Sequence, residues 1–215
     1  MNDVEGNEIK TILVGMTGTG KTNIINALTG KPFNTTLFST TTSSFIDKIM
    51  EVNNKKYHVE IWDTAGQERY RSLTKMFIND SKIVIIVYDI TDKKSFEEVD
   101  FWANTVKEIL GDTPIFGLAG NKKDLFQNEQ VDEEEGQKKA EEIGALFKLT
   151  SAKTGFGIND FMQKLLEEYI KKKGPKGEEK NGNENIKEEE DNNKRQRLGS
   201  SIDYYKHGKK KKKWC

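Results

Sequence analysis

The 215-residue chain has one cysteine, three prolines and no long apolar run. The single cysteine, Cys215, excludes a disulfide within the chain and a zinc site built from several cysteines, which favours a reducing compartment. The longest aliphatic run, residues 83–87 (IVIIV), is far too short to cross a bilayer and is typical of a buried strand. No apolar N-terminal segment resembles a signal peptide.

An excess of charge of either sign is also missing, since 35 basic and 35 acidic residues balance. The balance conceals two different regions. Residues 1–173 carry 23 basic and 27 acidic residues, whereas residues 174–215 carry 12 and 8. Because a nucleic-acid-binding domain is usually basic, we do not expect nucleic acid as a partner.

Short apolar runs alternate with helical patterns up to about residue 173, which predicts an α/β fold with a mostly parallel sheet and helices on both faces. The pair Asn53-Asn54 predicts a hairpin turn between the second and third strands. The third helix carries an apolar stripe at helical spacing, which indicates core packing: Phe96, Val99, Trp102, Val106, Ile109 and Leu110. The strands are expected near 9–14, 44–53, 56–62, 83–89, 114–120 and 146–150, and the helices near 21–29, 68–78, 94–110, 133–144 and 158–172.

The composition changes after Lys173. Gly174-Pro175 is expected to end the last helix, and Asn, Gly, Glu and Lys then dominate. Such a segment has too few apolar residues to form a core, so we expect residues 174–208 to be a disordered linker. The sequence thus predicts a folded domain over 1–173 and a disordered tail over 174–215.

Residues 15–22 (GMTGTGKT) match the phosphate-binding P-loop, G-x-x-x-x-G-K-[ST]. An apolar run precedes the motif and a helical pattern follows it, which is the context that the motif requires. Its glycines allow backbone N–H groups to surround a phosphate at a helix N-terminus, so a glycine-rich turn without a ligand is the weaker alternative. The predicted phosphate contacts are Gly15, Thr17, Gly18, Thr19, Gly20, Lys21, Thr22 and Asn23.

Three later segments each follow an expected strand, at the edge where open α/β sheets bind ligands. They are residues 63–66 (DTAG), 121–124 (NKKD) and 151–153 (SAK). Together with the P-loop, in this order and spacing, they resemble the small GTPases of the Ras superfamily over roughly residues 8–172. The resemblance implies the P-loop NTPase G domain, a guanine nucleotide (GTP or GDP) as ligand, and Mg²⁺ as cofactor.

The resemblance also implies how guanine is recognised. Asp124 would accept from the two donors of the guanine edge, which adenine lacks. Asn121 would support that edge, the Lys122 stem would pack on the base, and Phe33 would cover its face, unless Phe33 is merely a partly buried loop residue. In the third segment the Ala152 N–H would meet the guanine oxygen, flanked by Ser151 and Lys153.

For the metal, the resemblance implies Thr22, Asp63 and a threonine from residues 39–44 (STTTSS). Spacing favours Thr40, although Thr41 remains an alternative. The Gly66 N–H would contact the γ-phosphate. Gln67 would orient the attacking water, which makes Gln67 and Lys21 the expected catalytic residues; a surface role for Gln67 is the alternative. No internal arginine finger is evident, so hydrolysis is expected to be slow and to need an activating protein.

Residues 59–74 and 86–91 resemble the Rab branch of this superfamily, which regulates vesicle traffic. Residues 41–45 (TTSSF) and 77–81 (FINDS) depart from that branch in segments that face effectors in the family. In the family, the position of Thr17 is usually occupied by a smaller residue, and the β-branched Thr17 side chain could slow hydrolysis. The resemblance therefore predicts the nucleotide chemistry of this chain better than it predicts the partners.

The C-terminal segment also resembles the Rab branch. Cys215 is the expected prenylation site, with an unmodified thiol as the alternative. Lys209–Lys213 would supply the second membrane signal, with a nuclear-import or nonspecific anionic patch as the alternative. We expect a monomer on the cytoplasmic face of an intracellular membrane, with a soluble cytosolic pool. An exchange factor, an activating protein, effectors and a prenyl-chaperone are the partners that the resemblance implies.

Two other functions remain open. A GTP-binding scaffold with negligible hydrolysis is favoured by Thr17 and the unusual residues 41–45. A P-loop ATPase or small-molecule kinase is disfavoured by residues 121–124, and competition between GTP and ATP would distinguish it.

Overall fold

The computed structural model describes residues 5–35, 44–64 and 71–174. These residues form a six-stranded sheet in the order β2-β3-β1-β4-β5-β6. Only β2 and β3 pair antiparallel, so the mostly parallel sheet predicted from the sequence is confirmed. The strands are β1 (Glu5–Val14), β2 (Ser44–Val52), β3 (Lys55–Asp63), β4 (Ile83–Asp89), β5 (Ile115–Asn121) and β6 (Leu146–Leu149).

The turn between β2 and β3 lies at Asn53-Asn54, as predicted. Both residues have positive φ, 52° and 62°, which is the conformation of a two-residue hairpin loop. Asparagine tolerates this region better than other residues with a side chain, so the pair fixes the register in which Val52 faces Lys55.

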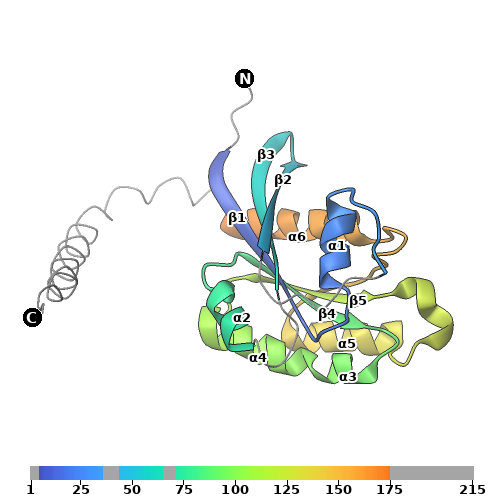
Figure 1. The fold of residues 1–215 in the computed structure, drawn as a ribbon. Coiled ribbons are helices and arrows are strands. Elements are labelled where there is room, and N and C mark those ends of the chain that lie inside the picture. Colours follow the sequence, from blue (N-terminus) through green and yellow to red (C-terminus); the bar gives the residue numbers. More distant parts are fainter. Residues whose placement is uncertain (1–4, 36–43, 65–70, 175–215) are drawn as a thin grey trace, which may run out of the picture. The chain divides into compact units, whose positions relative to one another are not determined.

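Helices cover both faces of the sheet (Figure 1). One face carries α1 (Lys21–Leu28) and α6 (Ile158–Lys173), which pack on alternate residues of the central strands, such as Leu13 of β1 and Ile85 of β4. The helices that pack with the opposite face are α2 (Arg71–Ile78), α3 (Lys93–Glu97), α4 (Val99–Leu110) and α5 (Glu133–Ile143). The central strands are therefore covered on both sides, and every residue of β4 and β5 is buried.

The apolar stripe predicted for the third helix belongs to the core. Phe96, Val99, Trp102 and Val106 are buried, and Ile109 and Leu110 pack against the same cluster. The single helix predicted over 94–110 was wrong, however, because the chain forms α3 and α4 with Glu98 between them. The Asp92 side chain caps the start of α3 by accepting a hydrogen bond from the Lys94 N–H. The break itself lies at Glu98, which has helical backbone angles and is neither glycine nor proline.

The sequence did not predict the 3₁₀ helix η2 (Lys123–Asn128), which follows β5. The helix expected over 68–78 is observed as α2 from Arg71, and its first residues lie outside the described ranges. Residues 175–215 also lie outside them, so the domain boundary near residue 173 and the linker over 174–208 stay predictions. None of the described helices is both long and apolar enough to cross a membrane.

Candidate nucleotide-binding site

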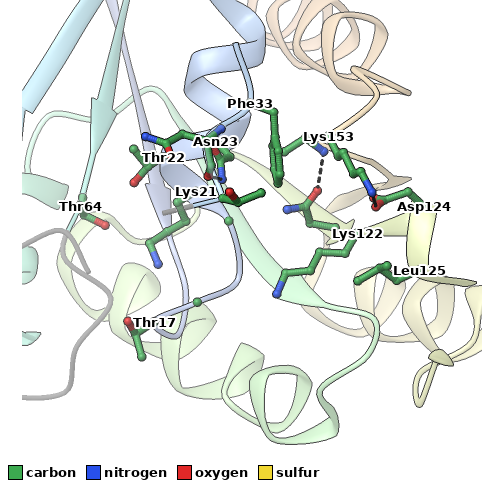
Figure 2. Close-up of a pocket in the computed structure, with 16 residues that line it drawn as sticks. Thr17, Lys21, Thr22, Asn23, Phe33, Thr64, Lys122, Asp124, Leu125 and Lys153 are labelled. Atoms are coloured by element: carbon green, nitrogen blue, oxygen red, sulfur yellow. Dashed lines mark hydrogen bonds and ion pairs between the residues drawn. The ribbon is translucent and has the colours of Figure 1, made fainter. Parts of the chain in front are cut away.

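Five parallel strands, β1, β3, β4, β5 and β6, end at the same edge of the sheet, and the segments that follow β1, β3, β5 and β6 contribute to a cavity of about 440 Å³ (Figure 2). Such a volume is typical of a small-molecule site. Lys21, Thr22 and Thr64 form what we call the phosphate end, and Asn121, Asp124 and Ala152 form the base end. The lining residues are Thr17, Gly18, Gly20, Lys21, Thr22, Asn23, Phe33, Asn34, Thr35, Thr64, Asn121, Lys122, Asp124, Leu125, Ala152 and Lys153.

Two glycines allow the loop between β1 and α1 to approach its neighbours closely. A Cβ atom on Gly15 would lie 2.2 Å from the Val87 carbonyl oxygen of β4. One on Gly20 would lie 2.4 Å from the Asn121 side-chain nitrogen. Both residues also have positive φ, 144° and 95°. Glycine at these positions therefore lets the loop lie directly against the strands that carry the rest of the site.

The Lys21 ammonium lies inside this loop. Nζ donates to the carbonyl oxygens of Gly15 and Met16, each at 2.8 Å, and the residue is 5% exposed. Burial lowers the pKa of Lys21 to about 8, and the nearby Asp63 carboxylate partly opposes this effect. A bound phosphate would supply the negative charge that stabilises the ammonium form.

Thr22 and Asp63 place two hard oxygen atoms side by side at the start of α1 and the end of β3. The Thr22 hydroxyl donates to Asp63 Oδ2 at 2.8 Å, and Asp63 is 6% exposed. Oxygen donors of this kind fit Mg²⁺. Within the described ranges no three His, Cys, Asp or Glu side chains group together to hold a metal. Mg²⁺ usually keeps water and phosphate oxygens among its ligands, and the pair would hold the ion together with such ligands.

Asn121 ties the two ends of the cavity together. Its side-chain nitrogen donates to the Thr19 carbonyl oxygen at 2.8 Å. Its side-chain oxygen accepts from the Ala152 N–H at 3.1 Å and the Thr150 hydroxyl at 3.3 Å. Because Asn121 is 1% exposed, these bonds are shielded from water and fix the P-loop against the loops after β5 and β6.

The Asp124 carboxylate is the acidic group of the base end. Oδ1 accepts from the Ser151 hydroxyl at 2.6 Å, and Oδ2 lies 4.0 Å from Lys153 Nζ. Figure 2 shows Asp124 and Lys153 at the end of the cavity opposite Lys21 and Thr22, with Lys122 between them. The cavity therefore has a fixed carboxylate at one end and, at the other, the Lys21 ammonium and the Thr22 hydroxyl, with the Asp63 carboxylate bonded behind it.

A model of the Ras family matches residues 10–171, three quarters of the chain and all of this site. The chain belongs to the Ras family. Members of this family bind GTP or GDP with Mg²⁺ and hydrolyse GTP, and the chain is accordingly a GTP-dependent switch with GTPase activity.

The Ras-family site is completed by Phe33, which is 40% exposed and lines the cavity. The loop that carries it is held by two reciprocal bonds between Asn23 and Asn34. The Asn23 side chain donates to the Asn34 carbonyl oxygen at 3.1 Å and accepts from the Asn34 N–H at 3.2 Å. Asn23, predicted as a phosphate contact, thus also determines where Phe33 can lie.

The structure brings together most of the residues selected from the sequence. Gly15, Thr19, Asp63 and Ser151 lie behind the lining and support it through backbone or side-chain contacts. Of the remaining predicted residues, Thr40, Thr41, Gly66, Gln67, Lys209–Lys213 and Cys215 lie outside the described ranges.

Sequence reasoning missed four lining residues of this Ras-family cavity: Asn34, Thr35, Thr64 and Leu125. Thr64 lies inside the segment DTAG that the sequence analysis selected, so the motif could have identified it. Its hydroxyl donates to the Leu13 carbonyl oxygen at 2.6 Å and joins the end of β3 to β1. Asn34 and Thr35 follow Phe33, and Leu125 follows Asp124. Their place next to a selected residue is the only sequence signal that indicates them.

Proposed function

We propose that the chain is a Rab-like GTPase that regulates intracellular vesicle traffic. The observation that carries the proposal is one cavity lined by Asp124, Lys21 and Thr22, with Asp63 bonded to Thr22 behind the lining. The Rab-like character is supported by residues 59–74 and 86–91, which resemble that branch in sequence.

Guanine selectivity is assigned to the base end. The Asp124 carboxylate has two oxygen acceptors for the two adjacent donors of the guanine edge, and Ser151 orients one of them at 2.6 Å. Adenine would offer no donors to the acceptor sites of this partly buried carboxylate that Ser151 does not use, which costs more than a missing contact on an exposed surface. The Ala152 N–H, which donates to Asn121 Oδ1 at 3.1 Å, lies on the same wall of the cavity, and a guanine oxygen would share or replace that bond.

Hydrolysis is assigned to Lys21 and Gln67. Water attacks the γ-phosphorus of GTP, the bond to the β–γ bridging oxygen breaks, and GDP and phosphate leave. Lys21 binds the phosphate oxygens, and Gln67 orients the water. When bound, Mg²⁺ neutralises the charge of the phosphates. We expect slow turnover without an activating protein.

Effectors are proposed to contact an aromatic surface beside the phosphate end. The rings of Phe45 and Trp62 stack at 5.0 Å, and Phe77 lies 5.5 Å from Trp62. Phe45 is 49% exposed, which is unusual for a large apolar side chain within such a cluster. In the sequence, Phe45 lies shortly after residues 36–43 and Trp62 shortly before residues 65–70, the two segments that contain the predicted nucleotide-sensing residues.

Membrane attachment is proposed through Lys209–Lys213 and a prenylated Cys215. A single lipid gives reversible anchoring, and adjacent lysines strengthen it on anionic lipid. The protein would then act on the cytoplasmic face of an intracellular membrane and keep a cytosolic pool bound to a prenyl-chaperone. An exchange factor would return it to the GTP-bound state.

A second candidate is a GTP-binding scaffold with negligible hydrolysis. The observation that favours it is Thr17, whose β-branched side chain lines the cavity beside Gly18. Crowding there would reduce the space for Gln67 and water.

The test is [γ-³²P]GTP hydrolysis by the full-length protein and by Gln67→Leu, each with and without excess ATP. Slow hydrolysis that Gln67→Leu abolishes and ATP leaves unchanged would support the GTPase. Tight GTP binding without hydrolysis in either protein would support the scaffold, and competition by ATP would contradict both.

The trafficking assignment is tested separately in cells. Fluorescently tagged wild type should co-fractionate with vesicle membranes, whereas Cys215→Ser should be cytosolic. Equal membrane association of the two proteins would contradict lipid attachment at Cys215.

A further inference from the structure

A buried carboxylate that the sequence analysis did not select lies beside the base end of the cavity. Asp89 ends β4 and pairs in register with Asn121 of β5. It is 6% exposed, although it does not line the cavity. Burial of an ionised carboxylate is costly unless it is paired and hydrogen-bonded, so the partners of Asp89 indicate its role.

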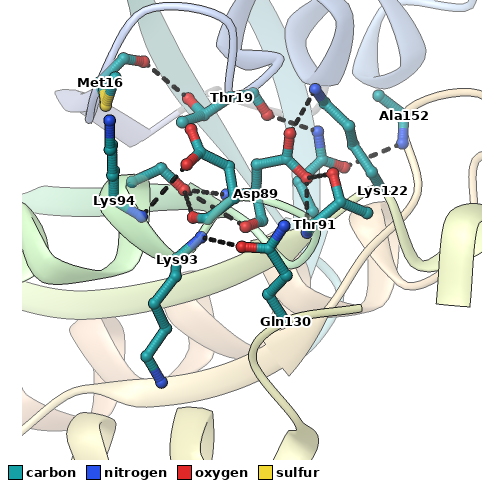
Figure 3. A network of polar contacts seen from close by, with 12 residues as sticks. Met16, Thr19, Asp89, Thr91, Lys93, Lys94, Lys122, Gln130 and Ala152 are labelled. Carbon is teal, nitrogen blue, oxygen red and sulfur yellow. Dashed lines mark hydrogen bonds and ion pairs between the residues drawn. The ribbon is translucent and has the colours of Figure 1, made fainter. Parts of the chain in front are cut away.

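Both carboxylate oxygens have specific partners (Figure 3). Oδ1 accepts from the Thr91 N–H at 2.9 Å and from the Thr91 hydroxyl at 2.7 Å. Oδ2 forms an ion pair with Lys122 Nζ at 2.5 Å. The Asp89 N–H also donates to the Ser95 hydroxyl at 2.9 Å. Thr91 and Ser95 thus fix the orientation of Asp89, and the remaining oxygen is directed to Lys122.

Lys122 needs such an anchor for two reasons. Its backbone has a φ of 70°, a left-handed conformation that is unfavourable for a residue with a Cβ atom. Its side chain has several rotatable bonds and is 32% exposed, so it could turn into solvent. The ion pair with Asp89 holds the ammonium and leaves the stem along the cavity wall, which Lys122 lines.

We propose that Asp89 is a positioning residue for the nucleotide base. By holding the Lys122 ammonium, it keeps the aliphatic stem as a preformed wall against which the base packs. Loss of the carboxylate should therefore speed nucleotide release without removing any direct contact with the ligand. The inference rests on the guanine-nucleotide function proposed above.

The test is the rate at which the full-length protein releases N-methylanthraniloyl-GDP in the presence of Mg²⁺. Asp89→Asn should accelerate release about tenfold, equivalent to about 1.4 kcal/mol. Lys122→Met keeps the stem and removes the ammonium, and it should accelerate release to a similar extent. The double variant should match Lys122→Met within about a factor of two, because Asp89 acts only through Lys122.

Two further variants sharpen the test. Thr91→Val removes one bond to Asp89 and should accelerate release by about threefold, again only when Lys122 is present. Asp100→Asn is the matched control, since Asp100 forms an exposed ion pair with Lys139 at 3.0 Å away from the cavity. It should leave release unchanged.

The proposal is overturned if Asp89→Asn leaves release unchanged or accelerates it as strongly in the Lys122→Met background as in wild type. Should Asp89→Asn fail to fold, the same comparison with Thr91→Val decides the question. A wild-type protein that does not retain the labelled GDP would instead overturn the proposed function, and the inference with it.

Discussion

The two ends of the nucleotide cavity are held in different ways. At the base end, side chains bond to side chains and to fixed backbone groups: Asn121 with Thr150, Asp124 with Ser151, and Lys122 with Asp89. At the phosphate end, Lys21 bonds to the carbonyl oxygens of its own loop, and Thr22 bonds to Asp63.

This difference has a consequence for binding. At the base end, the bond from Ser151 fixes the Asp124 carboxylate, which keeps acceptor capacity for guanine, so this acceptor is formed before a ligand arrives. At the phosphate end, the Lys21 ammonium is bonded to carbonyl oxygens of its own loop, and the Thr22 hydroxyl is bonded to Asp63. Binding there must exchange internal bonds for ligand bonds, which makes it sensitive to charge and pH. The following predictions test this contrast.

The largest effect is expected at the base end. Asp124→Asn removes a charged acceptor for two guanine donors, and GTP affinity should fall by about 10³-fold, since each such bond contributes about 2 kcal/mol. Xanthosine triphosphate, which has a carbonyl in place of the guanine amine, should lose less because asparagine can donate to it. Competition titrations measure both affinities. Equal losses for the two nucleotides would contradict a direct contact with the base edge.

The second largest effect is expected where Asn121 connects the two ends of the cavity. Gly20→Ala places a Cβ atom 2.4 Å from the Asn121 side chain, whereas a Cβ atom on Gly18 has no neighbour within 4 Å. Both glycines have positive φ, so alanine would strain the backbone at either position, whereas only alanine at position 20 would also clash with Asn121. We expect Gly20→Ala to lower the free energy of unfolding by about 3 kcal/mol and Gly18→Ala by about 1 kcal/mol. Chemical denaturation measures both free energies of unfolding. Similar losses in Gly20→Ala and Gly18→Ala would show that Asn121 does not restrict this loop.

The phosphate end should show a pH dependence that the base end lacks. Burial lowers the pKa of Lys21 to about 8 in the free protein, and bound phosphate favours the ammonium form. The contribution of Lys21 to GDP affinity is thus complete below pH 8 and is lost as the pH rises above it. The decrease should be about tenfold between pH 7 and pH 9.

The pH dependence is measured by calorimetry in buffers of different ionisation enthalpy, which also reports proton uptake near pH 8. Lys21→Met is the control and should bind weakly without this dependence. The same decrease in Lys21→Met would assign the titration to another group.

The smallest effect is expected where the loop after α1 reaches the base. Asn23→Ala removes two partly exposed bonds to Asn34 and should accelerate nucleotide release by about fivefold, equivalent to about 1 kcal/mol. Asn26→Ala, on the same helix, is the matched control. A stopped-flow release assay that finds no difference between these variants would contradict a role for Asn23 in holding Phe33.

Local sequence patterns predicted the parts of this molecule that depend on neighbouring residues. The P-loop, the Asn53-Asn54 turn and the strands expected over residues 83–89 and 114–120, observed over 83–89 and 115–121, follow from glycines, turn residues and apolar runs. The break between α3 and α4 was not predictable in this way, since Glu98 keeps helical backbone angles. The 3₁₀ helix after Asn121 was also missed, because the residue before it, Lys122, has a left-handed backbone conformation that lysine does not favour.

The sequence by itself determined the fold class, the family motifs and most of the residues that line the cavity, because these depend on residue type and short spacing. Only the tertiary structure decided which groups support them. Asp89 reaches Lys122 because β4 and β5 are neighbours in the sheet, and Asn121 reaches Thr19 because Gly20 leaves room for it. Such contacts join residues up to 102 positions apart, and they depend on strand order and close packing, which no local pattern encodes.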